Sequence, residues 1–320
     1  MGDEGKVRLG ISSCLLGNDV RYNGGHLNDS FLTGTISKYV EWVAVCPEVE
    51  MGMGVPRETI QLQGKSASPR LIATKTGVDH TEGMRSFAEA RVAELGGANL
   101  DGFVLTKDSP SCGLMRVKVH RKEGGPPSRD GIGAFAWVLT TRMPDLPVEE
   151  NGRLTDPRLR ENFVDRIFVR RRWRAMLHDS PTPRGLVSFH TAHKLTFMAH
   201  SIPYYREAGR IVAHVGSRPW DELVAEYARV MREALTFLAT PSKHTNVMHH
   251  LMGYLKKAID GGDKQELLGL IEEYRQERVP LVVPLTLLKH HLRKHDLPAW
   301  VHQQAYLSPY PEELMLRNHV

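Results

Sequence analysis

The sequence predicts an α/β protein: a Rossmann-like, parallel-sheet N-terminal domain followed by a second, all-α C-terminal domain. In the first 145 residues, short runs that are apolar throughout alternate with polar or helical stretches. Such runs are typical of strands buried on both faces of a parallel sheet. Beyond residue 181, apolar residues recur at helical spacing instead.

Four apolar runs in the first part are interpreted as strands, at residues 7–13, 40–45, 69–74 and 101–106. The stretch from Met84 to Gly97 predicts an amphipathic helix closed by a glycine cap. Residues 118–135 are rich in Gly and Pro and are interpreted as a loop. A further helix is expected to begin at Pro157, with Asp156 as its N-cap.

Pro181 and Pro183 mark a predicted domain boundary, which divides the chain into residues 1–180 and 181–320. The second part holds 12 of the 16 histidines and has helical patterns throughout. We expect about five helices there, at residues 185–201, 219–239, 243–259, 263–279 and 284–295.

The composition is that of a globular protein, with 41% hydrophobic and 25% charged residues. No apolar run approaches the roughly 18 residues of a membrane span, and the N-terminus lacks the layout of a secretory signal. We therefore expect a cytoplasmic protein. Three cysteines cannot pair off into a disulfide framework, and a net charge of +5 permits a polyanionic partner.

Each cysteine lies just beyond a predicted strand: Cys14 after residues 7–13, Cys46 after 40–45, and Cys112 after 101–106. Because function in parallel sheets gathers at the carboxyl ends of the strands, the three thiols are expected at one crevice. Buried cysteines are also common simply as small apolar residues. Convergence at one sheet edge favours a metal site over that alternative.

Two metal sites suit three thiolates. One is zinc with a bound water, although the chain has no Cys-x-x-Cys pair for it. The other is a [4Fe-4S] cluster whose fourth iron stays open to substrate. The residues alone leave both possibilities open.

Three segments resemble the signatures of the TudS-type thiouracil desulfidase family: "SSCLLG" with "VRYNG", "VCPEVEMGMGVPRE", and "KDSPSCG". The helical half is similar to the YbgA-like domain, and the whole arrangement resembles RudS-type tRNA 4-thiouridine desulfidases. The resemblance implies an iron–sulfur desulfidase domain at residues 1–180 with a [4Fe-4S] cluster on Cys14, Cys46 and Cys112. It implies a tRNA-binding domain at residues 181–320.

The implied reaction is a non-redox conversion of C=S to C=O, with an open iron as the Lewis acid. The resemblance points to Glu48 as acid/base and to Ser109 as a proton relay. Ser111 is a second candidate hydroxyl. Further contacts to the substrate are predicted from Ser13, Asn23, Arg57 and Ser111.

The run from Arg166 to Arg174 suits phosphate binding, so Arg170, Arg171, Arg172 and Arg174 are predicted to contact RNA. Trp173 and Tyr254 are expected either to stack on bases or to pack in the core. No carboxylate completes a metal-ligand set around the C-terminal histidines, which are therefore interpreted as core or RNA-contacting residues.

Three functions fit these features. The favoured one is removal of sulfur from 4-thiouridine in tRNA, because a free base needs no second, basic domain. The alternatives are a desulfidase of free thiouracil bases and a non-catalytic, cluster-bearing RNA-binding or sensor protein. The last would leave the placement of Glu48 and Ser109 unexplained.

Overall fold

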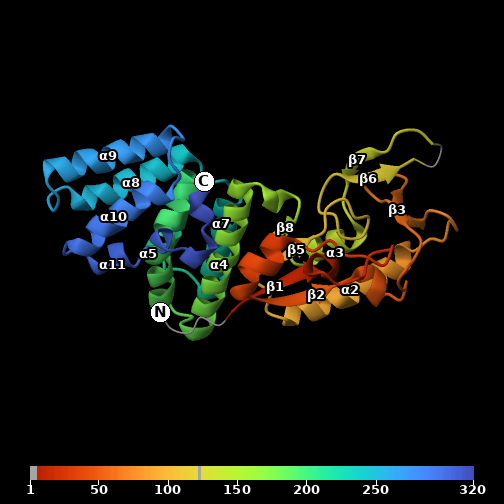
Figure 1. Cartoon of the computed structure of the whole chain (residues 1–320). Helices are drawn as coiled ribbons and strands as arrows, with labels where there is room; N and C mark the ends of the chain where they lie inside the picture. The colour runs from red at the N-terminus through yellow and green to blue at the C-terminus, as the bar shows by residue number, and fades with distance from the viewer. Residues whose placement is uncertain (1–5, 122–123) are drawn as a thin grey trace. The chain divides into compact units, whose positions relative to one another are not determined.

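The computed structural model describes residues 6–121 and 124–320, which form two compact units (Figure 1). The N-terminal unit ends at Thr155, and the helical unit runs from Asp156 to Val320. This division differs from the predicted boundary at residue 180, which falls in the short turn between α4 (Pro157–Asp179) and α5 (Pro183–His200). Helix α4 belongs to the helical unit because its apolar side chains share a core with those of α5 and α7 (Trp220–Thr236).

A four-stranded parallel sheet forms the centre of the N-terminal unit, in the order β2-β1-β5-β8. Its strands are β1 (Val7–Ser12), β2 (Val40–Val45), β5 (Gly102–Leu105) and β8 (Val148–Glu150). Every residue of β5 is buried, and so is all of β1 except Arg8. The predicted parallel sheet is confirmed, and its central strands are apolar because both of their faces are covered.

A second sheet of four strands, β4-β3-β6-β7, was not predicted. Its strands are β3 (Ile60–Gln63), β4 (Arg70–Ala73), β6 (Val117–His120) and β7 (Ser128–Gly131). The run at 69–74 is thus a strand, but it pairs antiparallel with β3 instead of joining the parallel sheet. The predicted loop at 118–135 overlaps the antiparallel β6–β7 pair, which begins at Val117. Strands β3 and β6 alternate apolar and polar residues, and β7 has no large apolar residue, so these three do not produce the apolar runs that identified the parallel strands.

The helices of the N-terminal unit pack on the parallel sheet. They are α1 (Pro47–Glu50), α2 (Thr81–Gly97) and α3 (Ala134–Arg142), with short turns η1 (Ser13–Leu16), η2 (Phe31–Thr35), η3 (Ile36–Lys38) and η4 (Arg153–Thr155). Helices α2 and α3 share one apolar core with β5, where the Phe103 and Phe135 rings lie 6.1 Å apart. The predicted glycine cap of α2 is wrong in detail: Ala98 stays right-handed, and the left-handed residue is Asn99.

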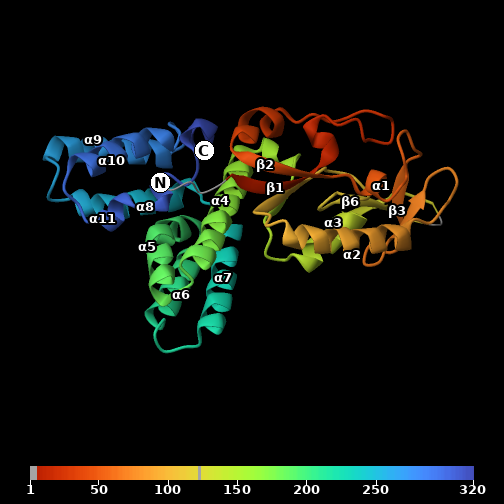
Figure 2. The same cartoon turned by 90° about the horizontal axis from the view of Figure 1, so that it is seen from below.

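The helical unit contains only helices and turns in the residues described, which confirms the all-α prediction. Beyond α4, α5 and α7 it has α6 (Ile202–Ala213), α8 (Pro241–Leu255), α9 (Gly261–Arg275), α10 (Val282–Lys294), α11 (Ala299–His302), η5 (Ala305–Leu307), η6 (Glu312–Leu314) and η7 (Leu316–Asn318). Helices α5, α6 and α7 lie side by side with α4 (Figure 2). Asp156 caps α4 as predicted, accepting hydrogen bonds from the backbone N–H groups of Arg158 (2.9 Å) and Leu159 (3.0 Å).

No described helix is both long and apolar enough to cross a membrane.

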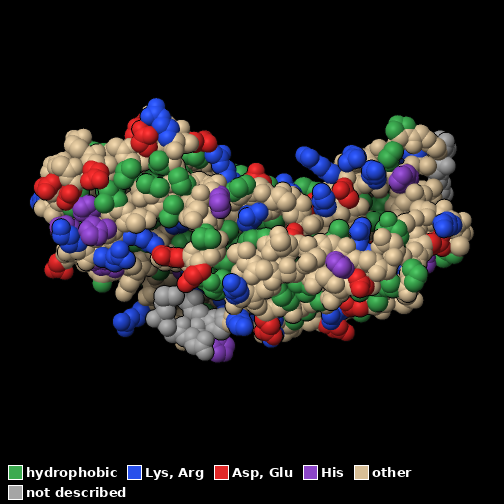
Figure 3. Space-filling view, viewed as in Figure 1, with side chains coloured by type: hydrophobic (Ala, Val, Ile, Leu, Met, Phe, Trp, Pro, Cys, Tyr) green, Lys and Arg blue, Asp and Glu red, His purple; other side chains and the backbone are tan. Residues whose placement is uncertain are grey.

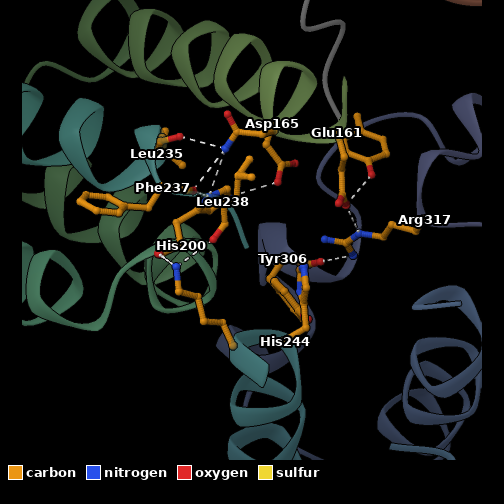
Figure 4. A network of polar contacts seen from close by, with 12 residues as sticks. Glu161, Asp165, His200, Leu235, Phe237, Leu238, His244, Tyr306 and Arg317 are labelled. Atoms are coloured by element: carbon orange, nitrogen blue, oxygen red, sulfur yellow. Dashed lines mark hydrogen bonds and ion pairs between the residues drawn. The ribbon is translucent and has the colours of Figure 1, made fainter. Parts of the chain in front are cut away.

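A buried polar network joins α4 to the C-terminal turns (Figure 4). The Glu161 carboxylate accepts hydrogen bonds from Tyr310 Oη (2.9 Å) and Arg317 Nε (3.1 Å), and Arg317 also donates to the Tyr306 carbonyl (2.6 Å). One turn along α4, Asp165 pairs with His200 at 3.3 Å. A charge buried this deeply is stable only when it is paired with an opposite charge or hydrogen-bonded. Because the partners of Glu161 lie in the C-terminal turns, the network fixes that segment against α4.

We expect Arg317→Met to destabilise the helical unit by about 3–5 kcal/mol, because it leaves the Glu161 carboxylate buried without its cation. The double variant Glu161→Gln/Arg317→Met removes both charges and should recover much of that loss. Urea unfolding followed by circular dichroism measures both. A single variant as stable as the parent protein would contradict this account of the network.

Three buried histidines of the helical unit are held neutral. Burial lowers the pKa of His190 to about 4 and that of His193 to about 3, and the nearby cations Lys194 and Arg172 act in the same direction. Burial also lowers the pKa of His244 well below its usual value. The unfolded chain binds protons near pH 6.5, whereas the folded unit does not, so stability is lost as the pH falls below about 6.5.

As the pH falls from 6 to 4, each of these histidines should lower the free energy of unfolding by up to about 1.4 kcal/mol per pH unit. All three together should lower it by about 4 kcal/mol per pH unit. Denaturant unfolding of the helical unit between pH 7.5 and 4 measures this slope. His190→Gln keeps a hydrogen-bonding group beside the Tyr227 hydroxyl and should reduce the slope by one proton. An unchanged slope would show that His190 titrates within the folded unit.

Candidate functional site

The three cysteines follow three adjacent strands and line one cavity of about 360 Å³. Cys14 lies in η1 directly after β1, Cys46 directly follows β2, and Cys112 lies in the segment after β5. Because β2, β1 and β5 run parallel, their carboxyl ends meet at the same sheet edge. The predicted convergence of the thiols is observed.

Cys14 is held by the tight turn that ends β1. Its carbonyl accepts hydrogen bonds from the N–H groups of Gly17 (3.3 Å) and Leu27 (2.9 Å). Gly17 adopts a φ of 86°, which strongly favours glycine. The Cys14 sulfur lies 3.2 Å from the Thr106 hydroxyl, so a residue beyond β5 contacts the thiol that follows β1.

Glu48 reaches the cavity from the short helix α1, which begins just after Cys46. Both Nε (2.8 Å) and Nη2 of Arg57 donate to the same carboxylate oxygen, Oε2. The Arg57 side chain is only 6% exposed and also donates to the Gly54 carbonyl. In the described part of the chain Oε1 has no hydrogen-bond partner, so one oxygen is anchored and the other is available to a substrate or water.

The first turn of α3 shapes the segment that carries Cys112. The N–H groups of Ala134 and Phe135 donate to the carbonyls of Pro110 and Ser111, both at 2.9 Å, and Gly133 donates to the Gly113 carbonyl at 2.7 Å. The otherwise unsatisfied N–H groups of a helix start are thereby used to fold the cysteine segment.

Ser109 lines the cavity from the same segment. Its Oγ accepts hydrogen bonds from the backbone N–H groups of Ser111 (3.2 Å) and Cys112 (3.0 Å). Because these bonds use the lone pairs of the oxygen, the hydroxyl proton can point into the cavity.

The thiols are costly to ionise unless a cation is near. Burial raises the pKa of Cys112 well above its ordinary value, and the Glu48 carboxylate acts in the same direction. Burial raises the pKa of Cys14 and of Cys46 as well, although the Thr106 hydroxyl opposes the effect at Cys14. A bound metal cation reverses this balance, since coordinated thiols are deprotonated outright. Three soft sulfur donors, each just beyond a different strand, suit an iron–sulfur cluster in which each thiolate binds a different iron.

Most of the predicted N-terminal site residues line the cavity, and two do not. Those lining the cavity are Ser13, Cys14, Cys46, Glu48, Arg57, Ser109 and Cys112. Asn23 and Ser111 do not line it. Asn23 is exposed and accepts the N–H of Gly25 (3.2 Å) within a turn, whereas Ser111 is completely buried.

Sequence reasoning missed several residues that line the cavity, including Arg21, Tyr22, Thr106 and Lys107. Tyr22 is 42% exposed, and the Arg21 guanidinium lies 5.8 Å from the centre of its ring. The only available signal was their position within or beside the cysteine motifs.

The predicted RNA-contacting arginines lie on α4. Arg170, Arg171, Arg172 and Arg174 are half-buried, and all four already have interaction partners. Trp173 is a core residue, stacked on Tyr227 with ring centres 5.4 Å apart. Tyr254 packs edge-on against Trp300 at 5.0 Å and remains partly exposed. Across residues 6–121 and 124–320, no three His, Cys, Asp or Glu side chains are grouped to hold a single metal ion.

Two sequence families match the chain. Residues 9–151 match the family described as 2-thiouracil desulfurase, and residues 194–311 match DUF1722, a protein family of unknown function. The chain is 32% identical over 164 residues to the uncharacterized protein YbgA of Escherichia coli (strain K12), covering 50% of this chain and 95% of that protein. It is also 32% identical over 108 residues to the uncharacterized protein YbbK of Bacillus subtilis (strain 168), covering 32% of this chain and 71% of that protein.

One solved structure is similar in part: the [4Fe-4S]-dependent thiouracil desulfidase TudS. It shares 28% sequence identity, with a TM-score of 0.39 over 47% of this chain and 94% of its own.

Gly133→Ala should disturb the Cys112 segment, because a Cβ there would lie 2.5 Å from the Ser111 carbonyl oxygen and 2.8 Å from the Gly113 nitrogen. We expect a loss of about 1–3 kcal/mol in stability and faster alkylation of Cys112 under native conditions. Gly97→Ala is the matched control, since no atom lies within 4 Å of its Cβ. Equal stability and equal Cys112 reactivity in the two variants would contradict the role of Gly133.

Proposed function

We propose a reaction for this chain on the basis of its family. Its N-terminal unit belongs to the 2-thiouracil desulfurase family. The proposed reaction is desulfuration of 4-thiouridine in tRNA, C=S + H₂O → C=O + H₂S, without net oxidation or reduction. The observation that carries it is the convergence of Cys14, Cys46, Cys112, Glu48 and Ser109 on one cavity.

The proposed cofactor is a [4Fe-4S] cluster held by the three cysteine thiolates, which supplies an open iron as a Lewis acid for the soft thiocarbonyl sulfur. In the proposed reaction, Glu48 Oε1 accepts a proton from the attacking water, and the support is that Arg57 already binds Oε2. The proposed role of the Ser109 hydroxyl is to donate a hydrogen bond to the reacting group. As the C–O bond forms and the C–S bond breaks, both protons of the water leave with the sulfide.

A nucleotide suits the cavity lining better than a free base. Tyr22 offers an exposed ring for stacking, and Arg21 and Lys107, which also line the cavity, suit phosphate groups. These residues support a thiolated uridine within RNA as the substrate. Reduced thiols and tRNA are both compatible with the predicted cytoplasmic location.

The helical unit is proposed to bind the tRNA. Helices α5, α8, α10 and α11 contain no Asp or Glu at all. On the face drawn in Figure 3, histidine, lysine and arginine side chains gather where α10 and α11 lie in Figure 1. Between α8 and α9, a shallow groove of about 200 Å³ is lined by His249, Lys256 and Lys264 and by apolar residues. We propose this groove as a phosphate contact, in addition to the predicted arginines of α4.

The alternatives are desulfuration of free thiouracil and a binding role without turnover. Anaerobically reconstituted protein incubated with thiolated tRNA and with free thiouracil distinguishes all three. The proposal expects uridine in place of 4-thiouridine after nucleoside analysis, with release of sulfide. Turnover of the free base alone, or binding without turnover, would select one of the alternatives.

Glu48→Gln and Ser109→Ala should each retain iron and sulfide but lose about 10²–10⁴-fold in kcat, the usual contribution of general acid–base groups. Alanine at Cys14, Cys46 or Cys112 should instead lose the cluster, seen as loss of iron and of visible absorption. Full activity in both the Glu48 and Ser109 variants would assign the proton transfer to other residues.

Charge reversal in the groove, Lys256→Glu/Lys264→Glu, should weaken tRNA binding and make the log–log salt slope shallower by about 0.7–0.9 for each lost phosphate contact. Arg206→Glu/Arg210→Glu is the matched control, because both residues are exposed on α6 and make the same charge change. Filter binding at 50–200 mM salt measures both double variants. Equal affinities for the two would exclude the groove as the RNA contact.

A further inference from the structure

We propose that Thr106 is a positioning residue for the iron–sulfur centre: its hydroxyl donates a hydrogen bond to the Cys14 sulfur and so tunes the bond between that sulfur and iron. The inference rests on the cofactor given in the proposed function. It assigns a role to a residue just outside the "KDSPSCG" motif.

Thr106 makes contacts at the sheet edge through both its side chain and its backbone. It is the first residue after β5, is 8% exposed, and its Oγ1 lies 3.2 Å from the Cys14 sulfur. Its backbone N–H donates to the Oγ of Ser12, the last residue of β1, at 3.1 Å. A threonine side chain is also stiff about χ1, so the hydroxyl is preorganised toward the sulfur.

Metal binding decides the direction of this hydrogen bond. In the free thiol, either the sulfur or the hydroxyl can donate. A metal-bound cysteine is a thiolate without a proton, so only Thr106 can then act as the donor.

Hydrogen bonds to the sulfurs help to set the reduction potential of an iron–sulfur cluster. A donor to a thiolate withdraws charge from it, which favours the reduced cluster and makes the iron a stronger Lewis acid. Removing the Thr106 hydroxyl should therefore make the reduction potential more negative and slow desulfuration about tenfold, the rate equivalent of one hydrogen bond.

The test compares Thr106→Val, which has nearly the same shape without the hydroxyl, with Thr106→Ser, which retains it. Full-length proteins are reconstituted anaerobically, matched for iron and sulfide, and titrated with dithionite while the reduced cluster is followed by electron paramagnetic resonance. Thr59→Val is the control, because Thr59 also lines the cavity but its hydroxyl pairs with Thr74 at 2.6 Å.

The inference expects a more negative potential for Thr106→Val, with Thr106→Ser and Thr59→Val close to the parent protein. An unchanged potential in Thr106→Val, or an equal shift in Thr59→Val, would overturn it. Should the valine variant not take up iron, Thr106→Ala removes the same hydroxyl with a smaller side chain and is read in the same way. A parent protein that takes up no iron would instead contradict the proposed cofactor.

Discussion

The parallel pairing of β2, β1 and β5 is the constraint on which the cysteine site depends. Ser12 lies opposite Val45, and Ile11 opposite Val104, so the three strands end at nearly the same level. A cysteine placed just beyond each strand then reaches one cavity, although the chain separates the three by tens of residues. Reversal of any one of these strands would send its cysteine to the opposite edge of the sheet.

Burial determines how easily the three thiols at this sheet edge ionise. A buried thiol resists ionisation, so the three cysteines are poor thiolates alone and good ligands for a cation. The same cavity holds Glu48 with one oxygen fixed by Arg57 and the other available. In the proposed function the two tasks are separate: the sulfurs hold the metal centre, while the carboxylate and the Ser109 hydroxyl take part in proton transfer.

The stability of the helical unit depends on charged and titratable groups buried in its core. Its core contains an ion pair between Glu161 and Arg317 and several neutral histidines, which an apolar core of the same size would not need. Removing one partner of such a pair costs more than removing both, so these groups act as a set. The basic residues left at the surface of the acid-free helices are consistent with a polyanionic partner.

The sequence by itself determined the fold class, the start of α4 at its Asp156 cap, and the convergence of the three cysteines at one sheet edge, because these depend on local patterns. It did not predict the second sheet, because β3, β6 and β7 lack an apolar run and the strand with which β4 pairs is not encoded in the residues of β4 itself. The unit boundary also depended on packing, since α4 joins the helical unit through side chains distant in sequence, such as Tyr227. Only the tertiary structure could show that Asn23 and Ser111 lie outside the cavity lining and that Arg57 anchors Glu48. Contacts of this kind join residues from different elements, and no local pattern in the chain specifies which side chains will meet.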